Sequence, residues 1–115
     1  MNVNLLAQII QGEASSLGPI GMMAVALSLS CRIWQNDHDE ARIAKEWMGR
    51  AEPGELAMFL ADMVACEELP ENDYLYCMGE KPDFIPNNWV DGDAVVRVGV
   101  DAIHLYKEWP KGKGE

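Results

Sequence analysis

The chain has 115 residues, of which 49% are hydrophobic and 24% charged, a composition typical of a globular protein. This length suits one domain around one hydrophobic core, so we expect a single domain over residues 1–115. The 19 acidic and 9 basic side chains give a formal charge of −10. Nucleic-acid binding depends on Lys and Arg contacts to phosphate, so this charge argues against a nucleic-acid partner.

Two apolar helical runs open the chain. The first has its apolar residues at helical spacing (Val3, Leu5, Leu6, Ile9 and Ile10), and Asn2 or Asn4 could cap its start. It is expected to end between Gly12 and Pro19, since Gly18 tolerates a left-handed conformation and Pro19 lacks an N–H. The second run, Ile20 to Trp34, is apolar around most of its circumference, which predicts a helix deep in the core.

Glu13 lies near the end of the first predicted helix, beside apolar neighbours. The negative end of the helix dipole and partial desolvation both favour the protonated form of a carboxylate at such a position. A carboxyl that is protonated near neutral pH can act as a general acid. From these residues alone, a solvated carboxylate at a helix end is the alternative interpretation.

Two further helices are predicted after Trp34. The first runs from about Asp37 to Arg50, with Asn36 or Asp37 as its cap. The second runs from about Pro53 to Glu68, where Met and Phe residues at helical spacing are typical of core filling. Most carboxylates around the second helix are expected to be solvated.

The pattern changes to strands and loops in the last third of the chain. Tyr74 to Met78 is typical of an extended segment, and Gly79 to Asn88 is rich in Gly, Pro and Asn, as loops are. The runs 95–100 and 103–107 are rich in β-branched residues and favour a terminal hairpin, although their apolar spacing also permits a helix. The fold class expected is α+β, mainly α-helical.

The sequence carries no clear motif for a cofactor, a metal ion or a targeting signal. Of the three cysteines, Cys31 is expected to be buried in the second helix, while Cys66 and Cys77 could pair. No Cys/His spacing suggests a metal site, and no cofactor is predicted. Residues 1–4 do not read as a secretory signal, and no run reaches the length of a membrane span. We therefore expect either that residue 1 is a mature start or that the protein is made in the cytoplasm; the oligomeric state is left open.

The segment from Gly12 to Arg32 resembles the opening motif of the cell-wall hydrolase family that includes spore-cortex-lytic enzymes. In that family a helix ends in Glu-Ala-Arg-Gly-Glu, followed by a Gly, an Ala-Val-Ala run and an Asn-Arg pair. The matching residues are Glu13, Ala14, Gly21, Ala24, Val25, Ala26 and Arg32. Residues 15–17 replace Arg-Gly-Glu, and Cys31 replaces the Asn. The resemblance places the family's catalytic Glu on Glu13 and implies a lysozyme-like helical core with a short C-terminal β-hairpin.

A second, looser resemblance covers the C-terminal half. Family members carry an extended aromatic segment, a loop ending in Trp and an Ile-Gly…His-x-Phe-Tyr end. Residues 74–78, Trp89, residues 98–99 and residues 104–106 stand in the corresponding places, with a longer spacing between Gly99 and His104. Sugar rings stack on aromatic faces, so Tyr74, Tyr76 and Trp89 are candidate substrate contacts, with core or loop-anchoring roles as the alternative. Ser28 or Ser30 is a further candidate for contact with the substrate or with Glu13, although we prefer a helix-packing role for these small residues.

The family resemblance implies cleavage of peptidoglycan glycan strands between N-acetylmuramic acid and N-acetylglucosamine. Lytic transglycosylases need one carboxylate, here Glu13, and give a 1,6-anhydro end; hydrolases usually need two. Asp73, Asp83 and Asp91 are possible second carboxylates. Without its own signal, such an enzyme would suit a phage or prophage lysis protein. The main alternative is a non-catalytic acidic binding or regulatory protein on the same fold, and an acidic mimic of nucleic acid is a third hypothesis.

Overall fold

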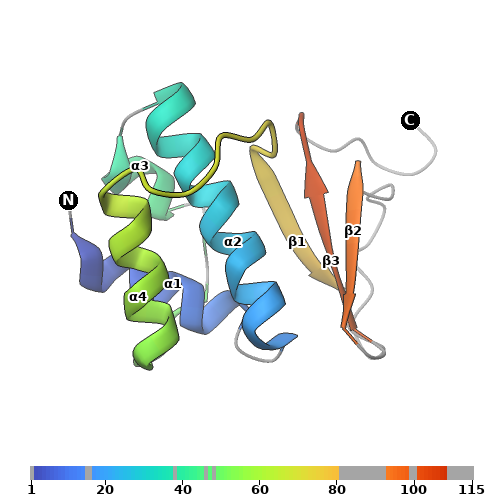
Figure 1. The fold of residues 1–115 in the computed structure, drawn as a ribbon, viewed down its shortest axis with the longest axis horizontal. Helices are drawn as coiled ribbons and strands as arrows, with labels where there is room; N and C mark the ends of the chain where they lie inside the picture. Colours follow the sequence, from blue (N-terminus) through green and yellow to red (C-terminus); the bar gives the residue numbers. More distant parts are fainter. Residues whose placement is uncertain are drawn as a thin grey trace.

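The computed structural model describes residues 2–14, 17–37, 39–45, 47, 49–80, 93–98 and 101–108. Within these ranges, four α-helices precede a three-stranded antiparallel sheet (Figure 1). The helices pack around α2 on one side of the molecule, and the sheet lies against the other side of α2 (Figure 1). The chain is therefore a mainly helical α+β protein, as its sequence predicts.

Helix α1 (Val3–Ala14) begins at the predicted cap. The Asn2 Oδ1 accepts a 3.0 Å hydrogen bond from the Leu5 N–H, which satisfies one of the free amides of the first turn. One face of the helix is fully buried and carries Leu6, Ile9 and Ile10. This face fixes the direction of α1, and thereby the place of Glu13 in its last turn.

Helix α2 (Gly18–Arg32) is the central element of the core, as predicted, and continues into a π-helical turn, Ile33–Asp37. Gly18 has a φ of +70°, a left-handed conformation that glycine adopts without a steric penalty. Pro19 follows in the first turn, where its missing N–H leaves no hydrogen bond unmade. The Gly-Pro pair thus begins α2, whereas the sequence had suggested that it ends α1, which already stops at Ala14.

The third helix is much shorter than predicted. Helix α3 spans Glu40–Lys45, and Asp39 caps it by accepting the Arg42 N–H at 3.1 Å, so the predicted start near Asp37 and the predicted end at Arg50 are both wrong. The physical reason lies in Arg50, whose guanidinium donates to the carbonyls of Ala44 and Trp47. The Arg50 side chain folds back and binds these carbonyls, as basic side chains do at the C-terminal end of a helix, so α3 ends at Lys45.

Helix α4 (Glu55–Ala65) lies within the predicted range, Pro53 to Glu68, and packs against α1 and α2. Its inward face carries Ala57, Leu60, Ala61 and Val64. It ends near Glu67, which has a φ of 56°, in the left-handed region that interrupts a helix. The indole N–H of Trp34 donates a 2.7 Å hydrogen bond to the Val64 carbonyl and ties this end to the turn after α2.

The sheet comprises β1 (Tyr76–Glu80), β2 (Ala94–Val98) and β3 (Asp101–Tyr106) in the order β1-β3-β2. Strands β2 and β3 form the predicted hairpin, with the backbone of residue 98 opposite that of residue 101. Strand β1 pairs antiparallel with β3, with Cys77 opposite Leu105. The hairpin therefore gains a third strand that comes from the aromatic segment.

Strand β1 begins two residues later than predicted, because Asn72 holds the preceding chain in a turn. The Asn72 Oδ1 accepts the N–H of Tyr74 at 2.9 Å, and its Nδ2 donates to the Leu27 carbonyl of α2 at 3.1 Å. The Cys31 thiol donates to the Asn72 carbonyl at 3.1 Å. Asn72 thus fastens the connection between helices and sheet onto α2.

The part of the chain that the structure describes contains no helix long and apolar enough to cross a membrane. Its three cysteines, Cys31, Cys66 and Cys77, all carry free thiols, so the suggested pairing of Cys66 with Cys77 is not formed. Trp89, Asp83 and Asp91, which the sequence singled out, lie outside the described residues, as does the tail after residue 108.

Candidate functional site around Glu13

The last turn of α1 is crossed at close range by the chain that follows α3. The Ala51 N–H donates to the Gln8 carbonyl at 3.2 Å, and the backbones of Gly12 and Gly49 approach so closely that neither position has room for a side chain. A Cβ on Gly12 would lie 2.6 Å from the carbonyl carbon of Gly49. Both glycines are required here for space between two backbones.

This crossing holds the carboxylate of Glu13. The Gly49 N–H donates a 2.6 Å hydrogen bond to Glu13 Oε1, and the Glu13 side chain is half-buried. The Arg50 guanidinium in turn donates to the Gly49 carbonyl at 2.8 Å and to the Trp47 carbonyl at 2.7 Å. The loop that presents the Gly49 amide to Glu13 is therefore itself fixed by the Arg50 side chain.

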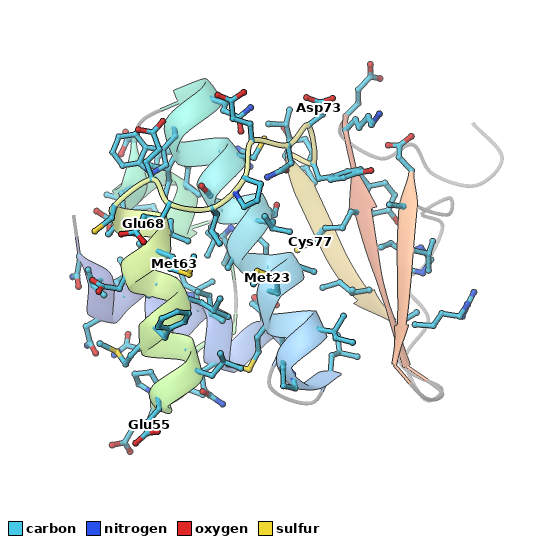
Figure 2. The ribbon with its side chains drawn as sticks, viewed as in Figure 1. Met23, Glu55, Met63, Glu68, Asp73 and Cys77 are labelled. Carbon is cyan, nitrogen blue, oxygen red and sulfur yellow. The ribbon has the colours of Figure 1, made fainter. Side chains whose placement is uncertain are left out.

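The charge of Glu13 also acts on Cys77 of β1, a residue that Figure 2 shows between α2 and the sheet. Burial raises the pKa of the Cys77 thiol, and the negative charge of Glu13 raises that pKa further. The Ser28 hydroxyl of α2 acts in the opposite direction as a hydrogen-bonding neighbour of the thiol. Residues from α1, α2 and β1 thus meet where the helices join the sheet.

Ser28, a candidate substrate contact from the sequence, is 0% exposed. Its hydroxyl has no well-formed hydrogen bond to any of the described residues, although it lies next to the Cys77 thiol. A buried hydroxyl without a good partner is uncommon in a folded protein. The structure therefore brings Ser28 to the site, beneath its surface, and a role in substrate contact stays a prediction.

The two candidate aromatic residues, Tyr74 and Tyr76, are half-buried and each lies beside a cation. The Arg32 guanidinium is 5.0 Å from the ring centroid of Tyr76, and the Lys107 ammonium is 5.8 Å from that of Tyr74. The ring of Tyr74 also packs against the hydrophobic core. Each ring thus already makes contacts within the fold, and its stacking on a sugar stays a prediction.

Asp73 is the one candidate second carboxylate among the described residues. It is exposed and lies near Cys31, whose pKa is raised first by burial and then by the Asp73 charge, while Arg32 lowers it. The Asp73 charge thus acts on the Cys31 thiol, whereas the Glu13 charge acts on the Cys77 thiol.

Metal binding finds no support in the described ranges, in which no group of His, Cys, Asp and Glu residues could hold an ion. His104, a residue of the looser resemblance, is buried in β3 and stacks on Tyr106 with the ring centroids 6.3 Å apart. Its place in the sheet is structural, away from any cluster of ligands.

Gly49 and Cys77 are site residues that the sequence did not single out. The crossing of α1 by residues 49–51 is a tertiary contact between segments 36 residues apart, and no local pattern encodes it. The available signal was the pair Gly12 and Gly49, since glycines in or beside helices often mark a close approach of two backbones. Cys77 carried no signal beyond its place in an extended aromatic segment.

No protein-family model, curated protein or solved structure matches this chain. Functional inference therefore rests on the chemistry of the residues around Glu13 and on the resemblance of the Gly12–Arg32 segment.

Proposed function

We propose that this protein cleaves the glycan strands of peptidoglycan between N-acetylmuramic acid and N-acetylglucosamine, with Glu13 as the catalytic acid. The observation that carries the proposal is the setting of Glu13: a half-buried carboxylate in the last turn of α1, hydrogen-bonded to the Gly49 amide, whose charge raises the pKa of the Cys77 thiol in β1. A carboxylate at the end of a helix, beside a small antiparallel sheet, is the arrangement of a lysozyme-like domain. That fold assignment is part of the proposal.

In the proposed reaction Glu13 gives its proton to the glycosidic oxygen while the bond from that oxygen to the muramic C1 breaks. The C6 hydroxyl of the same muramic residue then attacks C1, and its proton passes to the Glu13 carboxylate. The products are a 1,6-anhydromuramic end and a free hydroxyl on the departing strand. Glu13 returns to its protonated state, so one carboxylate is sufficient.

The hydrogen bond to Gly49 gives this mechanism a fixed geometry. It uses Oε1 of Glu13 and a backbone donor whose position depends on the crossing at Gly12. We assign the proton transfer to Oε2, the oxygen that this hydrogen bond does not use. A carboxylate held by one oxygen loses less rotamer freedom when it meets a substrate, which is the benefit of preorganisation.

Hydrolysis of the same bond by a muramidase-type mechanism is the alternative reaction, and it would need a second carboxylate. Asp73 is the described candidate, and its charge raises the pKa of Cys31, whereas the charge of Glu13 raises that of Cys77. The one-carboxylate route therefore agrees better with the described residues. Activity at the bacterial cell wall, as a phage or prophage lysis protein, is the setting that we propose for either route.

Release of dye from labelled peptidoglycan tests the proposal. The wild type should solubilise the wall, and Glu13→Gln should lose the activity by at least about a hundredfold, because general acid catalysis contributes about 10²–10⁴-fold. The Gln amide oxygen can still accept the Gly49 N–H, so the fold should persist. Glu68→Gln, which removes the same charge from an exposed position beyond α4, is the matched control and should retain full activity.

A non-catalytic binding or regulatory protein on the same fold is the second candidate. One observation favours it: Cys31, at the position of the family's Asn, is buried, and its thiol donates a hydrogen bond to the Asn72 carbonyl. Wild-type protein that sediments with peptidoglycan but releases no dye would support this candidate over the enzyme.

A further inference from the structure

An apolar surface runs along the two helices that pack side by side, α2 and α4. Each helix places three apolar residues at positions i, i+3 and i+7, which share one face of a helix. We call these residues the α2–α4 apolar face: Ile20, Met23, Leu27, Leu56, Phe59 and Met63. Figure 2 shows Met23 and Met63 on neighbouring helices, and α2 contacts α4.

This face is open to solvent. Phe59 is 61% exposed and Ile20 is 59% exposed, the two largest values among the exposed large hydrophobic residues that are described. Leu27 and Met63 are half-buried and join the face to the core. Single exposed apolar residues are ordinary, but a set on adjacent helices is typical of an interaction site.

The charges around the face have one sign. Residues 51–80 contain eight Asp or Glu residues and no Lys, Arg or His. Helix α2 contributes one basic residue, Arg32, which is buried. Figure 2 shows Glu55 at one end of α4 and Glu68 beyond its other end, and Asp62 is exposed on the same helix. Carboxylates therefore flank the α4 side of the apolar face, and we call them its acidic rim.

The negative charge of this rim distinguishes among the possible binding partners of the α2–α4 apolar face. A second copy of the chain would bring the same carboxylates against their own kind, and like charges across an interface are unfavourable. An anionic membrane surface or a nucleic acid is disfavoured for the same reason. A partner with a basic rim around an apolar stripe gains from both the burial of Phe59 and the attraction of the carboxylates.

We propose that the α2–α4 apolar face binds a cationic amphipathic helix of a partner protein. A third helix can pack its apolar residues at i, i+3, i+4 and i+7 against the ridges of two adjacent helices. Met23 and Met63 have flexible, polarizable side chains that adapt to an incoming surface. This inference uses residues separate from Glu13 and does not depend on the proposed function.

A synthetic helical peptide of about 18 residues, built from Leu and Lys with Leu at i, i+3, i+4 and i+7, serves as the probe. Binding is measured by calorimetry and located by amide chemical shifts. A Leu/Glu peptide with the same Leu positions and a Leu/Lys peptide of scrambled order are the peptide controls. Val95→Ser is the protein control, because Val95 is comparably exposed to Met23 but lies on β2, beside Arg97.

We expect the Leu/Lys peptide to bind with shifts confined to α2 and α4, and the Leu/Glu peptide not to bind. Phe59→Ser and Met23→Ser should each weaken the affinity about tenfold, while Val95→Ser leaves it unchanged. Raising NaCl from about 50 mM to about 500 mM should weaken it further, since the rim contribution is screened. Circular dichroism establishes that each variant is folded.

Several results would overturn the proposal. These are no binding at about 1 mM peptide, equal binding of the scrambled peptide, shifts that map to the sheet, or affinity that both Ser substitutions leave intact. A wild-type dimer that Phe59→Ser dissociates in sedimentation would also overturn it, because the occupant would then be a second copy of the chain.

Discussion

The amide of Gly49 donates a 2.6 Å hydrogen bond to Oε1 of Glu13, a residue 36 positions earlier in the chain. The donor is a backbone group, so its position depends on the path of the loop and not on the identity of one side chain. That path is fixed by the contact of Gly49 with Gly12 and by the guanidinium of Arg50. The geometry of the candidate catalytic acid is therefore a property of the fold.

The crossing of α1 by the loop should be sensitive to one added methyl group. Gly12→Ala should lower the free energy of unfolding by about 1–3 kcal/mol, because the new Cβ meets backbone atoms of Gly49 and Arg50, which cannot rotate away. Urea denaturation measures the change. In Gly54→Ala the nearest atom is the end of the Gln11 side chain at 3.4 Å, so the cost should stay below about 1 kcal/mol. Equal stability of the two variants would contradict the close approach.

Asn72 should stabilise the link between α2 and the sheet. Asn72→Ala removes the bonds to the Tyr74 N–H and the Leu27 carbonyl, with an expected loss of about 1–3 kcal/mol. Asn72→Asp keeps the acceptor for Tyr74 but turns a carboxylate oxygen toward the Leu27 carbonyl, so it should not restore the stability. Asn4→Ala, an exposed change on α1, should alter stability by less than about 0.5 kcal/mol. A fully stable Asn72→Asp protein would show that the bond to Leu27 contributes nothing.

Alkylation of the thiols tests which carboxylate faces which cysteine. The exposed Cys66 should react first with iodoacetamide, because Cys31 and Cys77 are shielded and their pKa values are raised. Glu13→Gln should speed the reaction of Cys77 and leave Cys31 unchanged, since it removes a charge that raises the pKa of Cys77. Asp73→Asn should do the reverse. Mass spectrometry of the labelled peptides gives the three rates, and the same response of both thiols to either substitution would contradict the geometry.

The raised pKa values of Cys31 and Cys77 predict that the folded protein loses stability at alkaline pH. Their pKa values in the folded protein lie above the ordinary value of 9.0, so above that pH the unfolded chain binds fewer protons than the folded chain. The free energy of unfolding should then fall as the pH rises, by at most about 1.4 kcal/mol per pH unit for each thiol. Urea denaturation at about pH 8 and about pH 10 measures the difference. Cys77→Ala should reduce this difference, and an unchanged difference would show that Cys77 does not contribute.

Local sequence patterns were sufficient to predict the helices and strands whose apolar residues have a strong periodicity. The apolar stripe of α1, the buried circumference of α2 and the β-branched runs of β2 and β3 each predicted an element that the structure confirms. Asn2 was correctly offered as a cap, because its side chain acts on an amide three residues later. These are interactions within a few residues, which sequence spacing can express.

Side chains that act across the fold account for the errors. Arg50 binds carbonyls of the preceding segment and ends α3 at Lys45, where helical spacing alone favoured continuation. Asn72 binds the Tyr74 N–H and delays the start of β1. For the candidate site, the sequence and its resemblance singled out Glu13, but the Gly49 donor and the neighbouring Cys77 thiol depend on contacts between distant segments.

The central claim is that Glu13 cleaves glycan strands, and analysis of the soluble products tests it most directly. Purified peptidoglycan is incubated with the wild type, Glu13→Gln or Glu68→Gln, and the released fragments are identified by mass spectrometry. We predict anhydromuropeptides from the wild type and from Glu68→Gln, and none from Glu13→Gln. Absence of any released fragment with the wild type, on walls that a known lytic enzyme digests, or equal release by Glu13→Gln, would contradict the claim.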